Sequence, residues 1–437
     1  NELRHAVGGV AAHTLRYFSE NKEEFNVFRA RGQAVWWLRH IYNSFKWWRA
    51  YSVNAEGERK DMPMLYVGES FGVVTSYEGK EADIVLSAFE NAWGIIDPED
   101  TGGTVFAIGY SERGGLFNSP DKYAVKTIIG GKYIGSGVSV AFPAKKNLRL
   151  MAEHTLKREG LPLSKSNISE EIKKMKVVIL SRKRHESLIE EVKSIGAQVI
   201  LVYEDDLSPV FAIARGDVDF ITGVGGVPEG VLSAMLVEKL GGEMTLRLIP
   251  DNVAVNEKLL SKIKNWDLFT MEEIEILKNF HIVKPETGKN DEIPFNRIFT
   301  SKDLARGEEM VFTASIIKET PWIKYENGNR VPGVEINPET GELTVHTIRI
   351  AGNGVEIVPI IYKTAINKLK NELKNNKFNP EEHINTHIQL AKVYAEFGLF
   401  EMADESLGKA MHDYGVNEDQ RRRCKVIIEY VRGLECL

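Results

Sequence analysis

Cysteine is almost absent from the sequence, because only Cys424 and Cys436 occur among its 437 residues. Two thiols close to one end of the chain exclude a disulfide framework and a zinc site built from cysteines. Their scarcity favours a reducing compartment, and we expect the cytoplasm or the plastid stroma. The first residue is Asn1 rather than a methionine, so the sequence does not decide whether a transit peptide precedes it.

Long apolar runs and an excess of positive charge are also missing. No run of 18 apolar residues occurs, so we expect a soluble protein without a transmembrane segment. The formal net charge is −6, which does not favour nucleic acid or an anionic membrane surface as a partner. Hydrophobic residues make up 43% and charged residues 27% of the chain, a composition typical of a globular protein with a large core.

The apolar pattern changes along the chain. Residues 1–52 predict helices, and from residue 62 the runs MLYVG, ADIVLSAF and TVFAIGY predict short strands. Residues 173–206 predict a strand, a helix and a strand, and residues 219–242 a strand, a glycine-rich turn and a helix. Further strands follow up to residue 360, with a polar loop at 285–294. This alternation predicts a layered α/β fold.

The pattern becomes helical again after residue 361. Small and aromatic residues recur there at the spacing of a tetratricopeptide (TPR) helical hairpin: Leu390, Ala391, Tyr394, Gly398, Ala403, Leu407 and Ala410. A final helix is predicted around residues 419–434. Because one such unit cannot form a stable solenoid, we expect a helical module packed on the main region, either as a docking arm or as a brace. The predicted domains are residues 1–360, with subdomains of about 1–170 and 171–360, and a helical extension over 361–437.

The segment GVGGVPEGVL, residues 223–232, carries the most chemical information. A strand ends there in a glycine-rich turn, and a helix follows whose first backbone N–H groups can bind phosphate oxygens. Glu229 lies beside them and can hold a divalent metal that bridges to the phosphate. The alternative is a tight turn in which the glycines only permit close packing.

The segment resembles the Gly-Gly-Ala-Pro-Glu-Gly-Val-Leu motif of the class II fructose-1,6-bisphosphatases, which belong to the lithium-sensitive phosphatase superfamily. Further segments are similar to motifs of that family, in the same order: MPMLYVGE (62–69), SPDKYAVKTI (119–128), VVILSRKRHESLIEEVKSIGA (177–197), LARGEEMVFTAS (304–315) and GELTVHTIRI (341–350). The resemblance covers about residues 5–360. It implies a layered α/β sugar-phosphatase fold and a Mg²⁺- or Mn²⁺-dependent hydrolysis of the 1-phosphate of fructose 1,6-bisphosphate.

The resemblance also implies a set of site residues. Those that match family metal ligands are Glu56, Glu58, Glu90 and Glu229. Those that match residues contacting the sugar phosphate are Tyr123, Arg182, Arg184, Asp206 and Gly226. The two arginines suit a phosphate because guanidinium groups bind it through paired hydrogen bonds.

Two metal positions depart from the family pattern. Asn26 and Ser87 stand where the family has aspartates, and Asn91-Ala92 replaces the Gly-Thr of the phosphate-binding turn. The stretch DPEDTGG, residues 97–103, spells nearly the missing motif about ten residues later, so Asp97 and Asp100 are alternative metal ligands. We interpret it as a loop, since the strand that should precede the motif ends at SAFENA.

Tryptophans gather in one segment near the N-terminal end: Trp36, Trp37, Trp47 and Trp48. Aromatic residues are enriched at the cores of protein interfaces, so this segment predicts contact with a protein partner or a second copy. The alternatives are that these side chains fill the core or that the segment is a helix at a membrane interface, which its mixture of Lys, Arg and Trp allows.

Three functions therefore stay open at this point. The reading we favour from the sequence is a catalytically eroded class II fructose-1,6-bisphosphatase homologue that serves as a structural or regulatory subunit, because loss of metal-ligand carboxylates weakens a metal site. The second is an active Mg²⁺- or Mn²⁺-dependent phosphatase with a rearranged site. The third is a sensor that binds a sugar phosphate without hydrolysing it.

Overall fold

A computed structural model of the chain describes most of the body of the protein. The described residues are 4–12, 30–39 without 33 and 37, 48–54, 65–72, 80–95, 102–254, 270–273 without 272, 281–283, 290–292, 297–337, 339–340, 342–352, 354–363, 365–375, 380–396, 400–412, 422 and 426. No helix among them is long and apolar enough to cross a membrane.

The first sheet has eight strands and is mainly antiparallel. Its strands are β1 (Trp48–Asn54), β2 (Ser70–Phe71), β3 (Lys80–Glu90), β4 (Thr104–Glu112), β13 (Val311–Lys318), β14 (Glu335–Ile336), β15 (Glu342–Ala351) and β16 (Gly354–Lys363). They lie in the order β14-β15-β13-β4-β3-β1-β2, and β16 pairs with β15. The pair β1 and β3 is parallel.

The second sheet has six strands in the order β12-β9-β5-β8-β6-β7. These are β12 (Phe299–Thr300), β9 (Gly242–Ile249), β5 (Tyr123–Gly130), β8 (Phe220–Gly226), β6 (Lys176–Leu180) and β7 (Gln198–Val202). A separate pair joins β10 (His281–Val283) to β11 (Asn290–Glu292). Short helical segments are α8 (Asp251–Ala254), α11 (Ser301–Leu304), η2 (Ala92–Ile95), η3 (Gly131–Tyr133) and η4 (Lys183–His185).

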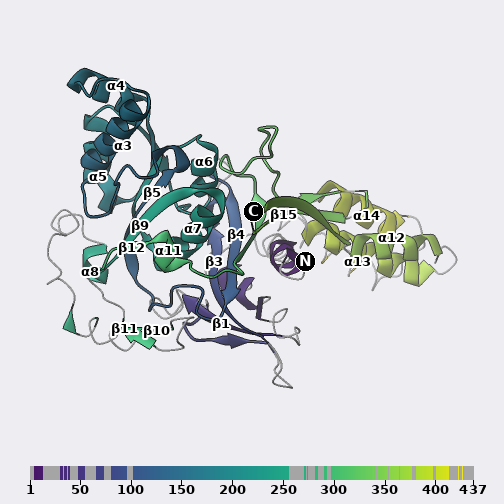
Figure 1. The fold of residues 1–437 in the computed structure, drawn as a ribbon. Coiled ribbons are helices and arrows are strands. Elements are labelled where there is room, and N and C mark those ends of the chain that lie inside the picture. The colour runs from purple at the N-terminus through teal and green to yellow at the C-terminus, as the bar shows by residue number, and fades with distance from the viewer. Residues whose placement is uncertain are drawn as a thin grey trace.

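Helices and sheets alternate in layers, as Figure 1 shows. Helices α6 (Pro209–Arg215) and α7 (Val227–Leu240) lie between the two sheets and share one core with them. Helices α3 (Ala144–Arg158), α4 (Lys165–Lys174) and α5 (Glu186–Ser194) cover the outer face of the second sheet. The helical residues 4–12 and 30–39 pack on the outer face of the first sheet. The α/β layers that the sequence predicts are confirmed.

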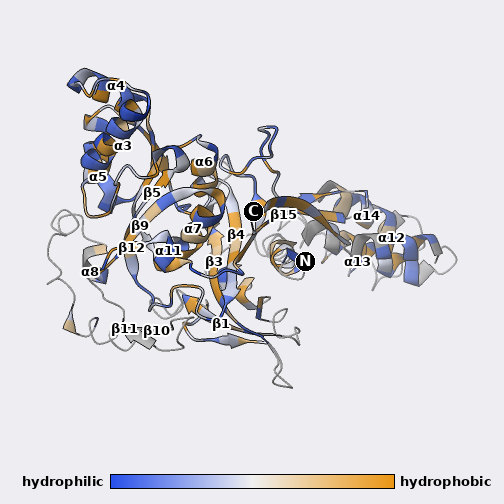
Figure 2. Cartoon of the chain, in the orientation of Figure 1, coloured by the Kyte–Doolittle hydropathy of each residue, from blue (hydrophilic) through white to orange (hydrophobic). Residues whose placement is uncertain are grey.

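The alternation of side chains along β3 and β4 explains this layering. Val85 and Ala107 belong to the core around α7, whereas Ile84 and Phe106 belong to the cluster with the N-terminal helices. Successive side chains of a strand point to opposite faces, so a strand covered on both faces is apolar throughout. Figure 2 accordingly shows β3 and β4 mainly in hydrophobic colours.

Three local predictions are wrong. Residues 48–52 are not helical but belong to strand β1, where pairing with β3 and β2 overrides the helical pattern. The MLYVG stretch is not a strand over its described part: residues 65–68 lead into a turn, with φ of +84° at Gly68. Within the polar stretch 285–294, residues 290–292 form β11 rather than a loop.

The C-terminal part contains α12 (Ala365–Asn375), α13 (Pro380–Glu396) and α14 (Phe400–His412). They share a core of their own, which includes Leu390, Tyr394 and Leu407. Ile336 of β14 packs against that core and joins the helices to the first sheet. The helices are present, as predicted, but the likeness to a TPR hairpin and the domain boundaries stay predictions. The predicted final helix at 419–434 lies outside the described residues except for 422 and 426.

Candidate functional site

The end of strand β3 brings the first carboxylate into the layer between the sheets. The pairing of β3 with β4 shifts between Ser87 and Glu90, and the backbone at Phe89 and Asn91 is left-handed, with φ of +66° and +56°. Such values are uncommon outside glycine and unfavourable for a bulky residue like Phe89. Apart from glycine, asparagine is one of the few residues that adopt the left-handed region readily. Asn91 therefore keeps the backbone turn at the position where the resemblance places a glycine.

Side-chain hydrogen bonds hold this turn. The Asn91 amide donates to the carbonyl of Gly103 at 2.9 Å, and the Thr104 hydroxyl donates to the carbonyl of Asn91 at 2.8 Å. The Ser87 hydroxyl donates to Oε1 of Glu90. Ser87 thus orients the adjacent carboxylate, although it cannot supply the charge of an aspartate.

Four buried acidic residues gather near this turn: Glu90, Asp205, Asp206 and Glu229, each less than 10% exposed. The backbone N–H of Asp206 donates to Oε2 of Glu90 at 3.2 Å. Burial is the main cause that raises the pKa of Glu90 well above its ordinary value of 4.5. The charges of Asp206, Glu229 and Asp205 act in the same direction. Burial also raises the pKa of Asp205 to about 7. The cluster therefore concentrates negative charge that favours a cation.

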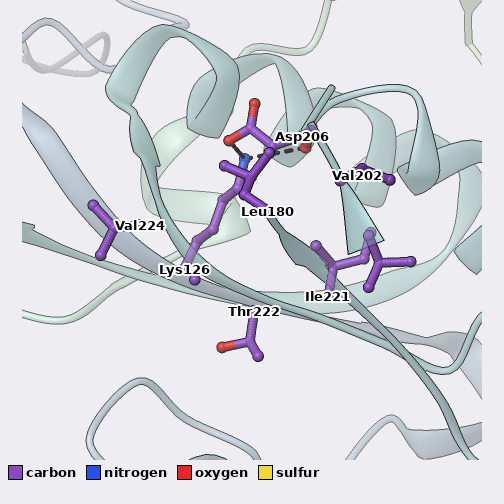
Figure 3. A pocket seen from close by; sticks show the side chains of 9 residues that line it. Lys126, Leu180, Val202, Asp206, Ile221, Thr222 and Val224 are labelled. Atoms are coloured by element: carbon purple, nitrogen blue, oxygen red, sulfur yellow. Dashed lines mark hydrogen bonds and ion pairs between the residues drawn. The ribbon is translucent and has the colours of Figure 1, made fainter. Parts of the chain in front are cut away.

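Lys126 supplies one cation from strand β5. Its Nζ lies 2.6 Å from Oδ2 of Asp206 and donates to the Asp206 carbonyl at 3.1 Å, and the side chain is 3% exposed. Figure 3 shows this pair at a cavity of about 10 Å³, with Thr222 pointing away from Asp206. Gly225 permits the arrangement, because a Cβ there would lie 2.1 Å from Oδ2 of Asp206.

Glu229 lies in the first turn of α7, directly after the glycine-rich end of β8. Gly226 is the N-cap and Pro228 follows it, a favoured residue near a helix start. As a glycine, the N-cap residue has no side chain that could cap this end of the 14-residue helix. The helix start carries partial positive charge and donor N–H groups, which suits both the Glu229 carboxylate and a bound phosphate.

The predicted sugar-phosphate residues come from neighbouring elements. Tyr123 begins β5 and is the register partner of Gly226 at the end of β8. The Arg184 guanidinium lies 5.4 Å from the Tyr123 ring centroid and donates to the Val224 carbonyl at 3.0 Å. Arg182 is half-exposed and pairs with Glu204 at 2.7 Å. The structure therefore brings Tyr123, Arg184 and Gly226 together, and it places Arg182 at the surface nearby.

His185 fixes the arginine segment to the sheet. Strands β6 and β8 pair only near their starts, at Val177 and Val178. Beyond that point His185 lies between them: Nε2 accepts the Val224 N–H at 2.9 Å, and Nδ1 lies 2.8 Å from the Leu180 carbonyl. Both bonds need the neutral ring with its proton on Nδ1. Burial lowers the pKa of His185 to about 4, so the ring stays neutral at pH 7.

Several predicted residues lie outside the described part of the chain. These are Asn26, Glu56, Glu58, Asp97, Asp100, Trp37 and Trp47. Of the other tryptophans, Trp36 is 54% exposed, and its role at an interface stays a prediction. Trp48 belongs to β1.

A divalent cation fits the donor set only in part. Glu90 and Glu229 are buried carboxylates, and hard oxygen donors are the ligands that Mg²⁺ prefers. Within the described ranges, however, no three acidic, histidine or cysteine side chains gather closely enough to hold a metal by themselves. Glu90 and Glu229 can therefore supply two ligands of such an ion, and the ligand set is complete only with donors from other segments.

Sequence reasoning did not select three buried polar residues of the candidate site: Lys126, His185 and Asp205. Only Lys126 lies in an apolar segment, YAVKTII, where a lone charged residue is a signal that the sequence contains. The pattern could not reveal which partner each one meets, because Lys126 and Asp206 are 80 positions apart in the chain.

Comparisons with known proteins point to one family. A family model described as the glpX-encoded bacterial fructose-1,6-bisphosphatase matches residues 20–351. A D-fructose 1,6-bisphosphatase class 2/sedoheptulose 1,7-bisphosphatase from Gloeobacter violaceus is 30% identical over 306 residues, which cover 68% of this chain and 79% of the relative. A protein of the same description from Acaryochloris marina is 29% identical over 294 residues, covering 65% of this chain and 76% of the relative.

Proposed function

The chain belongs to the family of glpX-encoded bacterial fructose-1,6-bisphosphatases, and from this premise we propose that it is an active, divalent-metal-dependent sugar-bisphosphate phosphatase. Its substrate is fructose 1,6-bisphosphate, and the 1-phosphate leaves. The similar proteins are named for this activity and for the hydrolysis of sedoheptulose 1,7-bisphosphate, which favours the active reading over catalytic erosion.

One observation carries the proposal: Glu90 and Glu229, from β3 and α7, lie in one buried acidic cluster beside the start of α7. Glu90 and Glu229 would hold a Mg²⁺ or Mn²⁺ ion together with donors from other segments, and such an ion would supply positive charge for the phosphoryl group. The N–H groups at the start of α7 bind oxygens of the same phosphate.

The remaining residues position the substrate. Arg184 and Tyr123, whose side chains lie 5.4 Å apart, contact the sugar and its other phosphate group, and Arg182 adds a guanidinium at the edge. Lys126 holds Asp206 in place and offsets part of the negative charge of the cluster. The acidic cluster lies between the two sheets and is largely shielded from water. Electrostatic interactions between these side chains and a bound phosphate are therefore stronger than they would be in water.

The direct test is release of phosphate from fructose 1,6-bisphosphate by the full chain with Mg²⁺ or Mn²⁺. We expect turnover by the wild type and a loss of about 100-fold or more in Glu229→Gln, because loss of a metal ligand should exceed the effect of an outer-shell change. Glu238→Gln, on the same helix, is the matched control and should keep its activity. Absence of turnover by the wild type under both metals would sink the proposal.

The second candidate is the eroded homologue, and it rests on Ser87 and Asn26, which replace carboxylates. Ser87→Asp decides between the two. An eroded site should gain phosphatase activity when Ser87 becomes a carboxylate beside Glu90. If other donors have replaced the lost carboxylates as metal ligands, Ser87→Asp should instead lower the activity. The new carboxylate would repel the carboxylate of Glu90, to which the Ser87 hydroxyl donates a hydrogen bond in the wild type.

A further inference from the structure

Strand β5 begins between the two strands that lead into α7 and α8. Tyr123, its first residue, is the register partner of Gly226 in β8 on one side and of Ile249 in β9 on the other. Helix α7 starts directly after Gly226, and α8 starts two residues after Ile249. The residue before Tyr123 is Lys122, which therefore lies between the starts of two helices, at the edge of the sheet where Glu229 follows β8.

Lys122 is a buried lysine that contacts both helix starts. Its backbone carbonyl accepts the N–H of Val227, the first residue of α7, at 3.1 Å. Its Nζ donates to Oδ2 of Asp251, the first residue of α8, at 2.8 Å and to Oε1 of Glu273 at 3.1 Å. The side chain is only 6% exposed, and lysines are rarely buried to this extent unless they are paired. The two carboxylates compensate its charge.

Glu273 joins a third segment to the same point. Its carboxylate accepts the Asp251 N–H at 3.0 Å and the Thr270 N–H at 2.9 Å, in addition to the Lys122 ammonium. Burial alone would raise the pKa of Glu273, but hydrogen bonds from these two N–H groups and from Lys122 hold the pKa below its ordinary value of 4.5. The carboxylate is therefore ionised at neutral pH and binds the segments of Lys122, Asp251 and Thr270 together.

Helix α8 also supports the residues to which we assign the sugar phosphate. Ala254 of α8 is fully buried and forms a small core cluster with Val224 and Ile249, and Tyr123 packs against this cluster. The Arg184 guanidinium lies 5.4 Å from the centroid of the Tyr123 ring. Loosening α8 therefore removes part of the support of Tyr123 and alters the surroundings of Arg184.

We propose that Lys122 is a positioning residue for the phosphatase reaction, which fixes α8 against Tyr123 and thereby orients the sugar of the substrate. This inference rests on the proposed function. The side chain of Lys122 acts through Asp251 and Glu273, whereas its backbone carbonyl, which a side-chain substitution leaves in place, holds the start of α7. Loss of the side chain should therefore weaken substrate binding and leave the chemical step beside Glu229 nearly unchanged.

Steady-state kinetics with fructose 1,6-bisphosphate and Mg²⁺ or Mn²⁺, well below the melting temperature, test this role. We expect Lys122→Met to raise KM by about tenfold, the effect of losing one hydrogen bond between charged groups, while kcat changes by less than about threefold. Lys122→Arg, which keeps the charge and can donate to both carboxylates, should have a KM within about threefold of the wild type. A purely structural role would lower the melting temperature without this division between KM and kcat.

Lys132→Met is the matched control. Lys132 follows the other end of β5 and pairs with Asp219 at 2.6 Å, but it is 46% exposed, so this variant should keep the wild-type KM. Asp251→Asn should raise KM as Lys122→Met does, and the double variant should have a KM close to that of Lys122→Met alone, because both substitutions break the same ion pair. A double variant whose KM rises by the product of the two single effects would contradict action through Asp251.

Hydrogen exchange of the metal-free full chain tests the same inference without turnover. Residues 251–254 should exchange faster in Lys122→Met than in the wild type, whereas the exchange of α3 should stay the same. Should Lys122→Met fail to fold, Asp251→Asn, whose side chain is 41% exposed, permits both measurements. A wild type without turnover would overturn the proposed function. An active wild type whose KM is unchanged in Lys122→Met and Asp251→Asn, or unchanged exchange of residues 251–254, overturns this inference alone.

Discussion

The buried ion pair between Lys126 and Asp206 is important for the folding of the acidic cluster. Lys126 and Asp206 are both less than 10% exposed and lie 2.6 Å apart in a cluster with three further carboxylates. An ion pair in such surroundings adds little net stability, but removing one partner leaves an uncompensated charge. The lysine therefore matters more for the integrity of the cluster than a surface lysine would.

Lys126→Met should lower the free energy of unfolding by about 3–5 kcal/mol, measured by chemical denaturation. Lys132 offers a matched control, because it pairs with Asp219 at the same distance of 2.6 Å but is half-exposed. Lys132→Met should cost only about 1 kcal/mol or less. Equal losses in the two variants would contradict the assigned role of Lys126. Restoring neutrality with Asp206→Asn should recover part of the loss in Lys126→Met.

His185 makes the stability depend on pH. Its folded pKa of about 4 lies below the ordinary value of 6.5, so the unfolded state binds the proton first. Stability is fully present above pH 6.5 and falls as the pH decreases towards 4, with a slope of up to about 1.4 kcal/mol per pH unit. His185→Gln keeps an acceptor but cannot take up a proton.

Denaturation curves of wild type and His185→Gln between pH 7 and pH 4.5 check this point. The difference in unfolding free energy between them should shift in favour of the variant as the pH falls. A difference that stays constant over this range would show that His185 does not titrate as its burial requires.

At the scale of elements, α7 depends on how closely β4 approaches it. A Cβ at Gly109 of β4 would lie 2.3 Å from Sδ of Met235 and 2.8 Å from Cγ1 of Val85. Gly109→Ala should therefore destabilise the fold by about 1–3 kcal/mol through overpacking and displace the middle of α7, where Met235 lies. Gly131→Ala, where the new methyl group meets nothing within 4 Å, should change the melting temperature little. Similar melting temperatures for both variants would contradict this packing.

The same elements show what the sequence could predict. Strands β3, β4, β6 and β8 and helices α5 and α7 follow from their periodicity, because each is covered on the faces that its pattern makes apolar. Strand β1 could not be predicted, since its conformation is set by pairing with β3, about 30 positions later in the chain. For the candidate site, the motifs led to Glu229, Arg184 and Tyr123, whereas Lys126 and His185 depend on partners that only the folded sheet brings near.

At the scale of the whole molecule, the C-terminal helices form a core separate from that of the layered body. Their cluster meets the first sheet through Ile336, and Lys370 donates to the Glu339 carbonyl. Removing residues 365–437 should therefore leave the layered body folded, with a single cooperative unfolding transition. If these helices are a docking arm, the truncated chain should also fail to co-purify with its partner. A truncated chain that does not fold would show instead that the helices are needed for the core of the layered body.

The central claim is that the cluster between β3 and α7 hydrolyses the 1-phosphate of fructose 1,6-bisphosphate. Phosphorus-31 NMR of the substrate with Mg²⁺ and the full chain tests it most directly, because it distinguishes the two phosphate groups. We predict that the 1-phosphate signal decays while inorganic phosphate and fructose 6-phosphate grow in equal amounts. A substrate spectrum that stays unchanged, or a decay of the 6-phosphate signal instead, would contradict the account.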